Sequence, residues 1–426
     1  MNYLDEVIQA QKRNEKKGIP SICSAHPTVI AAAFSHALAH NSSLLIESTC
    51  NQVNQFGGYT GMTPPDFVAY IKDIAEEYEF PEQNLILGGD HLGPAVWQAE
   101  PADAGMAKAR VLVRDYVHAG YQKIHLDASM KLRDDPEGPL KIEKSAKRAA
   151  DLARVAEDAW MQRDYGAAPR YVIGSEVPVP GGARDVERHL IPTEVGDTEK
   201  TLQATKHAFY QQGLEAAWER VIALVVQPGV EFGHDFILDY DPDAAQALSR
   251  FVEGKNLVYE AHSTDYQTLN ALQGLVRDHF AILKVGPALT FAYREAVFAL
   301  AMMEEILLPE HQRSNLIGTL DQVMVSNPMH WQKYYQGDSA QQQFARLYSL
   351  SDRCRYYWSD PILQEALQRL LENLQYHTLP LSLISQFMPN QYEQIRQRRI
   401  SNSAEELIKD KIVEVLEIYR LATSSS

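Results

Sequence analysis

The chain has 426 residues, of which 45% are hydrophobic and 23% are charged. That composition is typical of a globular protein with one large core and an extension. The net charge is -16, from 40 basic and 56 acidic residues. Non-specific binding to nucleic acid or to anionic membranes needs a basic face, so this balance argues against both. An anionic metabolite is not excluded, because a pocket can be locally basic in an acidic protein.

The three cysteines, Cys23, Cys50 and Cys354, are widely scattered and form no CxxC motif. Neither a zinc knuckle nor a disulfide framework is therefore indicated. The first 18 residues are polar and do not resemble a secretory signal. No apolar run approaches the length of a membrane span. We therefore expect a protein of the reducing cytoplasm.

Eight short apolar runs predict buried strands of a parallel sheet, and helical stretches separate them. In chain order the predicted elements are strand Ile19–Ser24, helix Thr28–His40, strand Leu44–Ser48, helix Thr63–Tyr78, strand Leu85–Gly89, helix Ala102–Ala119, strand Lys123–Asp127, helix Lys144–Arg163, strand Tyr171–Glu176, helix Thr198–Glu219, strand Ile222–Gln227, helix Asp241–Glu253, strand Leu257–His262, helix Thr268–His279 and strand Ile282–Val285. This alternation predicts an α/β fold of the (β/α)8 TIM barrel type.

After Thr290 the pattern changes to helices separated by prolines, with one further candidate strand at Leu379–Ile384. This part is too large to be only the eighth barrel helix. We therefore predict a barrel over residues 1–300 and a helical extension over residues 301–426, packed on the barrel or on a partner.

Ionisable residues recur where the predicted strands end, which is the end at which α/β barrels place their chemistry. Because side chains alternate across a strand, His125 and Asp127 share one face, and the same spacing places Glu260 and His262 together. Asp90 and His91 are adjacent, so they converge only if the strand bends. The preceding pair of glycines permits such a bend.

Histidine nitrogens and carboxylate oxygens from different strands suit zinc or another divalent metal. The preferred candidate ligands are His91, Glu176 and His262, and those in reserve are His125, Asp127, Glu231 and His234. The alternative is that these groups form only a hydrogen-bonded polar plug in the barrel mouth.

Asp90 and Lys284 are the candidate catalytic residues. A lysine in an apolar strand could form a Schiff base with a keto sugar if burial lowered its pKa. Ion pairing or phosphate contact is favoured, because nearby carboxylates keep a lysine protonated.

Two glycine-containing loops are candidates for phosphate binding, together with Lys284. Gly57 and Gly58 follow the second strand, and Gly286 follows the eighth, where barrels often bind phosphate near a helix start. Neither loop matches a Walker A or GxGxxG motif, so no nucleotide cofactor is expected. The aromatic and basic segment Ser351–Trp358 suits either a docking surface or a helix packed on the barrel.

Several long motifs resemble the non-catalytic subunit of D-tagatose-1,6-bisphosphate aldolase. They are Ser24–Pro27, Asn51–Met62, Gly88–Pro94, Ser175–Gly182, Val225–Phe232, Glu260–Gln267 and Lys284–Phe291. The resemblance runs from about Gly18 into residues 380–394 and so covers nearly the whole chain.

The resemblance implies a (β/α)8 subunit that a separate class II, zinc-dependent aldolase subunit requires for full activity and stability. The pair would cleave tagatose 1,6-bisphosphate in galactitol or N-acetylgalactosamine breakdown, by way of tagatose 6-phosphate. We therefore expect an oligomeric protein whose partner is that catalytic subunit. Some members carry a tagatose-6-phosphate kinase label, which the absence of a nucleotide motif here does not support.

The resemblance also assigns roles at the mouth. Asp90-His91 resembles the Asp-His pair of class II aldolases, in which the histidine binds zinc and the aspartate moves a proton. His262 matches a second strand-end histidine. No third histidine is assigned, and Glu176 is the candidate for its position. That departure leaves two hypotheses open, an accessory subunit with a vestigial mouth or a metal-dependent aldolase or 4-epimerase acting on phosphorylated ketohexoses.

Overall fold

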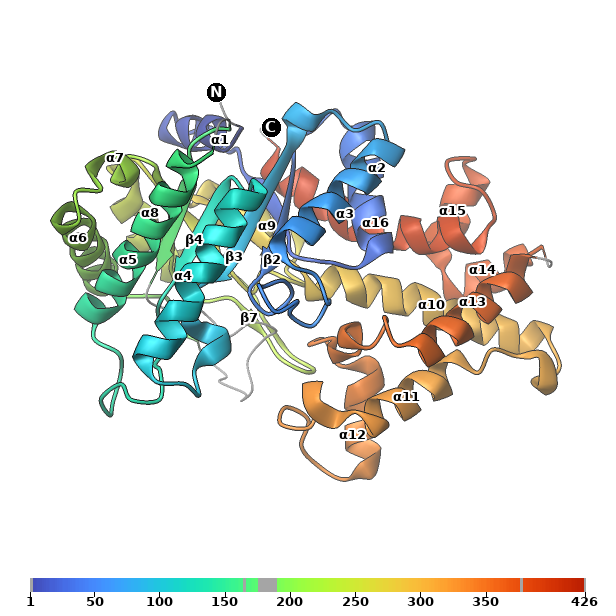
Figure 1. Cartoon of the computed structure of the whole chain (residues 1–426). Helices are drawn as coiled ribbons and strands as arrows, with labels where there is room; N and C mark the ends of the chain where they lie inside the picture. Colours follow the sequence, from blue (N-terminus) through green and yellow to red (C-terminus); the bar gives the residue numbers. More distant parts are fainter. Residues whose placement is uncertain (1–2, 164–165, 175–189, 376–377, 425–426) are drawn as a thin grey trace.

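The computed structural model describes residues 3–163, 166–174, 190–375 and 378–424. Eight parallel strands close into a barrel in the order β1-β10-β9-β6-β5-β4-β3-β2, which confirms the predicted (β/α)8 fold (Figure 1). The strands are β1 (Ile19–Ile22), β2 (Leu44–Thr49), β3 (Leu85–Leu92), β4 (Lys123–Asp127), β5 (Arg170–Gly174), β6 (Val221–Val225), β9 (Val258–Ala261) and β10 (Phe280–Val285).

Helices surround this barrel as the alternation predicts. They are α2 (Pro27–Ala39), α3 (Pro64–Glu77), α4 (Ala102–Ala119), α5 (Ile142–Met161), α6 (Val195–Gln211), α7 (Glu215–Trp218), α8 (Pro242–Glu253), α9 (Leu269–Arg277) and α10 (Pro287–Leu307). The prediction of one helix over 198–219 was wrong, because the chain breaks between α6 and α7. Gly213 lies there with φ +64°, a left-handed conformation that glycine adopts without strain.

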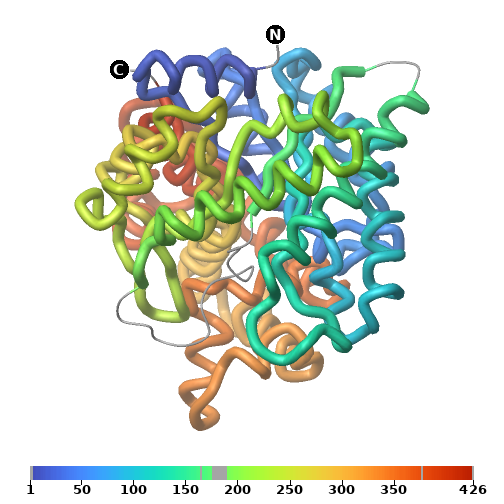
Figure 2. The backbone as a smooth tube through the Cα atoms, turned by 90° about the vertical axis from the view of Figure 1, so that its left-hand side faces the viewer, coloured from blue at the N-terminus to red at the C-terminus, as the bar shows by residue number. Residues whose placement is uncertain are grey.

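The barrel interior is layered. Its lower layer is apolar, with Ile86, Val172 and Ile282 packed in one cluster with Leu4 and Val7 of α1 (Tyr3–Lys12). This short helix therefore covers the amino-terminal end of the barrel. Both chain ends lie at that end of the molecule (Figure 2). The opposite end, where the strands finish, is left for polar side chains.

The C-terminal part is helical and lies mainly to one side of the barrel (Figure 1). It contains α11 (Leu316–Ser326), α12 (Ser339–Tyr348), the short 3-10 helix η5 (Arg353–Tyr356), α13 (Pro361–Gln375), α14 (Leu381–Phe387), α15 (Pro389–Arg396) and α16 (Ala404–Thr423). The candidate strand at Leu379–Ile384 was wrong. Pro380 precedes the first turn of α14 and cannot donate to a sheet.

The last helix returns to the barrel. α16 packs against α10, α9 and α2 and so adds to the outer helical layer beside β1. α10 itself continues through residue 300, and the proposed domain boundary there stays a prediction. In the described residues, no helix combines the length and apolar character that crossing a membrane requires.

Candidate functional site

The carboxyl end of β3 is bent, as convergence of Asp90 and His91 requires. The pairing of β3 with β4 shifts register between Gly89 and Leu92, and His91 has φ +50°. A left-handed conformation in a non-glycine residue is uncommon, and such strain tends to accumulate at functional sites. The next turn is equally tight, because a Cβ on Gly93 would lie 1.6 Å from the Asp127 carbonyl oxygen.

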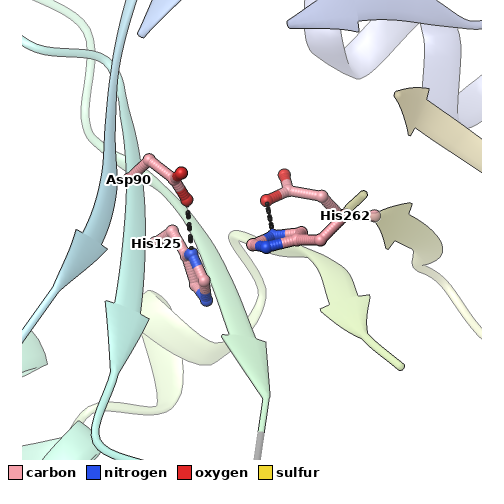
Figure 3. A group of neighbouring side chains, drawn as sticks. Asp90, His125 and His262 are labelled. Carbon is pink, nitrogen blue, oxygen red and sulfur yellow. Dashed lines mark hydrogen bonds and ion pairs between the residues drawn. The ribbon is translucent and has the colours of Figure 1, made fainter. Parts of the chain in front are cut away.

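Three histidines meet at the barrel mouth, each bonded to a carboxylate through one ring nitrogen. The pairs are His125 Nδ1 with Asp90 Oδ1 at 2.8 Å, His91 Nδ1 with Asp127 Oδ2 at 3.0 Å, and His262 Nε2 with Glu260 Oε1 at 3.0 Å. The three rings contact one another, with centroids 4.9 to 5.3 Å apart. Figure 3 shows His125 and His262 facing the same space between the strands.

The second ring nitrogens of the histidines differ, because His91 Nε2 lies 3.6 Å from Asp90 Oδ2 whereas His125 Nε2 is left for a ligand. Asp90 is ionised and can only accept, so we assign the Nδ1 proton of His125 to that bond, although the His91 N–H also lies 3.2 Å from this nitrogen. Nε2 of His125 is buried and has no hydrogen-bond partner in the described part of the chain. Histidines that bind metals usually donate their other N–H to a carboxylate.

The donor set fits a divalent metal on its own chemistry. One ligand atom from each of Asp90, His125, Glu260 and His262 lies within 4.8 Å of the others, and all four residues are buried. Imidazole and carboxylate ligands suit zinc and related ions. His125, predicted only as a reserve ligand, thus lies in this donor group, whereas His91, a preferred candidate, does not.

Two buried lysines balance the carboxylates beneath the histidines. Lys123 is fully buried and lies 2.6 Å from both Glu47 Oε1 and Glu260 Oε2. Lys284 pairs with Glu47 and lies 2.9 Å from Asp90 Oδ2. Burial alone would lower the pKa of Lys284, but Asp90 and its neighbouring carboxylates raise that pKa well above its ordinary value. Lys284 is therefore a charged ammonium rather than a Schiff-base nucleophile.

The pKa values of the neighbouring carboxylates and histidines are also shifted from their ordinary values. Burial opposes ionisation of Asp90, yet His91, Lys284 and the bond from His125 hold its pKa well below the ordinary value. Burial lowers the pKa of His262 to about 4, so its ring is neutral near pH 7. For His91 the two adjacent aspartates outweigh burial and raise the pKa. At the mouth the Asp90 carboxylate is therefore ionised and the His262 ring is neutral, whereas His91 is protonated more readily than an ordinary histidine.

A cavity of about 100 Å³ opens above these groups. Asp90, His91, His262 and Lys284 line its floor. Its walls come from the loops that follow the strands and from η5 of the C-terminal part, which supplies Arg355 and Tyr356. The segment Ser351–Trp358 thus lies on the barrel, with Trp358 buried against Tyr293.

The predicted phosphate-binding glycines are placed differently from one another. Gly286 lines the cavity, but its N–H already donates to Asp265 Oδ1 at 2.9 Å. Gly57 and Gly58 do not line that cavity, and both of their N–H groups bond to Asn54. Lys284 is at the cavity floor.

Two of the reserve ligands, Glu231 and His234, are not gathered at the histidines. Glu176 lies outside the described residues. Glu231 is buried in β7 (Glu231–Phe232), which forms a hairpin with β8 (Ile237–Leu238), and burial raises its pKa to about 7. His234 is exposed in the turn of that hairpin. Sequence reasoning missed Glu47 and Lys123, whose signal was a charged residue within an apolar strand.

Comparison with known proteins identifies the family. The family described as "D-tagatose-1,6-bisphosphate aldolase subunit GatZ/KbaZ-like" matches residues 4–424. The chain belongs to the GatZ/KbaZ-like family. A crystal structure of a probable tagatose 6 phosphate kinase from Sinorhizobium meliloti 1021 is 43% identical, with a TM-score of 0.87 over 95% of this chain and 100% of that one.

Two aldolase structures are much less similar to this GatZ/KbaZ-like chain. The YdjI aldolase from Escherichia coli K12 is 10% identical over 87% of this chain and 94% of that one, with a TM-score of 0.43. Fructose-bisphosphate aldolase from Campylobacter jejuni is 12% identical over 88% and 92%, with a TM-score of 0.44. These values are too low to transfer an activity, so the chemistry of this chain has to be argued from its own residues.

Proposed function

We propose that this chain is an accessory subunit that supports the activity and stability of a class II tagatose-1,6-bisphosphate aldolase. The observation that carries the proposal is the family match over residues 4–424. The catalytic subunit of that aldolase would be its partner, and breakdown of galactitol or N-acetylgalactosamine through tagatose 6-phosphate its pathway. A kinase activity, such as the name of the Sinorhizobium meliloti relative states, has no nucleotide-binding motif to support it in this sequence.

The geometry of the mouth favours a second function that is compatible with the first. Three carboxylate-bonded histidines meet at the mouth, where His91 and His262 line the cavity, and buried ionisable groups are costly unless they are paired or used. We propose that the mouth is a working metal-dependent centre for a phosphorylated ketohexose, acting as an aldolase or a 4-epimerase. A polar plug would need no unpartnered imidazole nitrogen, whereas His125 Nε2 is one in the described part of the chain.

His125 and His262, which lie in the four-residue donor group, would hold zinc or another divalent metal, together with the predicted ligands His91, whose ring contacts both, and Glu176. Such a metal supplies a Lewis acid that polarises the ketose carbonyl. Asp90 is the acid/base candidate, because its ionised carboxylate lines the cavity and can accept a proton from bound sugar. Lys284 keeps Asp90 ionised and adds positive charge to the cavity floor.

The two functions are separated by measuring cleavage of tagatose 1,6-bisphosphate with added zinc. The pure protein, a catalytic subunit of the family and their mixture are assayed side by side. Activity of the mixture above that of the catalytic subunit alone supports the accessory function. Cleavage or 4-epimerisation by the pure protein, lost with a chelator and in His262→Ala, supports the metal-dependent centre. If the mixture shows no gain and the pure protein no turnover, both proposals fail.

A further inference from the structure

The C-terminal part contributes a rigid wall to the mouth cavity. The loop before η5 is bonded to three separate barrel elements. The Thr290 hydroxyl of α10 donates to Asp352, Tyr266 Oη donates to the Leu350 carbonyl at 2.5 Å, and the Leu350 N–H donates to the His234 carbonyl at 2.9 Å. η5 is thus fixed over the ends of the barrel strands, and the position of Arg355 with it.

The Arg355 guanidinium contacts only neutral oxygens in the described part of the chain. Nη1 donates to the carbonyls of Ser351 at 2.5 Å and Asp352 at 2.9 Å, and Nη2 donates to Tyr356 Oη at 2.8 Å. Tyr59 is a further neutral partner. These bonds hold the fork in one orientation and leave part of its five-donor capacity for a ligand. No described carboxylate forms an ion pair with it within 4.0 Å, although half-buried charges of this kind are usually paired.

The nearest acidic residues are already bonded elsewhere. Asp352 accepts from Thr290 and from Cys354 Sγ. Asp265 accepts the N–H groups of Gly286 and Ala288 at the start of α10, at 2.9 and 2.8 Å. Both carboxylates act on Arg355 only through space. At the cavity floor the situation is reversed, because Lys284 is neutralised by Glu47 and Asp90.

Arg355 stands where two cavities adjoin. It lines the mouth cavity, which Asp90 and His262 also line, and a neighbouring cavity of about 490 Å³. Tyr59, Gln52 and Tyr356 line both spaces as well. The guanidinium therefore lines the same cavity as residues of the histidine cluster. Arg355 itself belongs to the C-terminal part of the chain, whereas the histidines belong to the barrel.

We propose that Arg355 binds the phosphate of a phosphorylated ketohexose whose keto end lies at the histidine cluster. The inference rests on the proposed metal-dependent function and names the residue that recognises its substrate. A planar guanidinium with unused N–H donors matches the geometry of phosphate oxygens and forms strong, charge-assisted hydrogen bonds with them. It also gives the C-terminal part a role in the site, since no barrel strand supplies this cation.

The test is calorimetric binding of D-tagatose 6-phosphate and of D-tagatose to the full-length protein loaded with zinc. Arg355→Gln removes the charge, Arg355→Lys keeps the charge without the planar guanidinium, and Arg369→Gln is a matched control at an exposed position of α13. Thermal unfolding of each variant establishes that it is folded. We expect Arg355→Gln to weaken binding of the phosphorylated sugar about 10- to 100-fold and to leave binding of the neutral sugar unchanged. Arg355→Lys should fall between, and Arg369→Gln should match the unmodified protein.

The outcomes separate this inference from the function on which it rests. If the unmodified protein binds the phosphorylated sugar and both Arg355 variants bind it equally well, the inference is wrong and the proposed function stands. If both sugars weaken together, Arg355 shapes the cavity and does not recognise phosphate, which also overturns the inference. If the unmodified protein binds neither sugar, the proposed ligand and the inference fail together. Should Arg355→Gln not fold, the comparison with Arg355→Lys decides.

Discussion

Asp265 Oδ1 accepts the N–H of Gly286 at 2.9 Å, at the first turn of the helix that follows the eighth strand. Barrels often bind a substrate phosphate with these amides. Here a carboxylate of the chain itself takes that position, and it also accepts the Ala288 N–H at 2.8 Å. These two amides are therefore not available to a phosphate, which draws attention to the Arg355 guanidinium, which has no carboxylate partner in the described residues.

Asp265 should make the protein less stable as the pH rises. Burial raises its pKa from 3.8 to about 6, so the folded state binds this proton more tightly than the unfolded state. Ionisation then lowers stability as pH rises between these values. Asp265→Asn cannot ionise, so its free energy of unfolding relative to the unmodified protein should rise by up to about 3 kcal/mol from about pH 4 to pH 7. Urea unfolding across that range measures this, and parallel profiles would contradict it. Asp158→Asn, at an exposed position of α5, is the control.

Lys123 should be essential for the fold rather than for binding. It is buried between Glu47 and Glu260, so Lys123→Met removes one of the two lysines that balance these buried carboxylates and leaves only Lys284. We expect a loss of about 3–5 kcal/mol in the free energy of unfolding, measured with denaturant. Lys200→Met removes an exposed pair with Asp197 and should cost under about 1 kcal/mol. Equal losses in the two variants would mean that the buried cluster is not held by charge.

Zinc affinity should fall more when a proposed ligand histidine is removed than when the carboxylate hydrogen-bonded to that histidine is changed. His125→Ala removes a proposed ligand and should abolish stoichiometric zinc binding measured by calorimetry. Asp90→Asn leaves the ring in place but loses its carboxylate partner, and should weaken binding about 10- to 100-fold. His207→Ala changes an exposed histidine of α6 and should bind zinc normally. Normal zinc binding by His125→Ala would remove this histidine from the site.

Gly93 should be intolerant of any side chain. A Cβ there would lie 1.6 Å from the Asp127 carbonyl oxygen, so Gly93→Ala has to displace the strand end that carries Asp127. We expect a loss of about 3 kcal/mol or more, or failure to fold. A Cβ on Gly196 in α6 would meet no atom within 4 Å, so Gly196→Ala should stabilise the helix by about 0.5–1 kcal/mol. Differential scanning calorimetry compares both, and a mild effect at Gly93 would show that the turn can relax.

Much of the architecture could be predicted because it depends on local patterns. Apolar runs of strand length separated by amphipathic stretches predicted the barrel, and strand alternation correctly placed His125 on the interior face while Ile124 and Leu126 pack outward. The glycines before Asp90 also signalled the bend of β3. The candidate strand at Leu379–Ile384 failed because a short apolar run does not distinguish strand from helix.

The sequence by itself determined the eightfold alternation and the identity of the ionisable groups at the strand ends. Both follow from side-chain periodicity along single segments. Only the tertiary structure decided the partners, because these join residues far apart in the chain. It paired Lys123 with Glu47 and Glu260, and it placed Asp265 on the helix start that had been predicted to bind phosphate. It also brought Arg355 from the C-terminal part to the mouth. Sequence separation does not predict such contacts. Burying an unpaired charge is costly, so in the folded protein each buried charge lies beside an opposite charge or at a position where a ligand can bind.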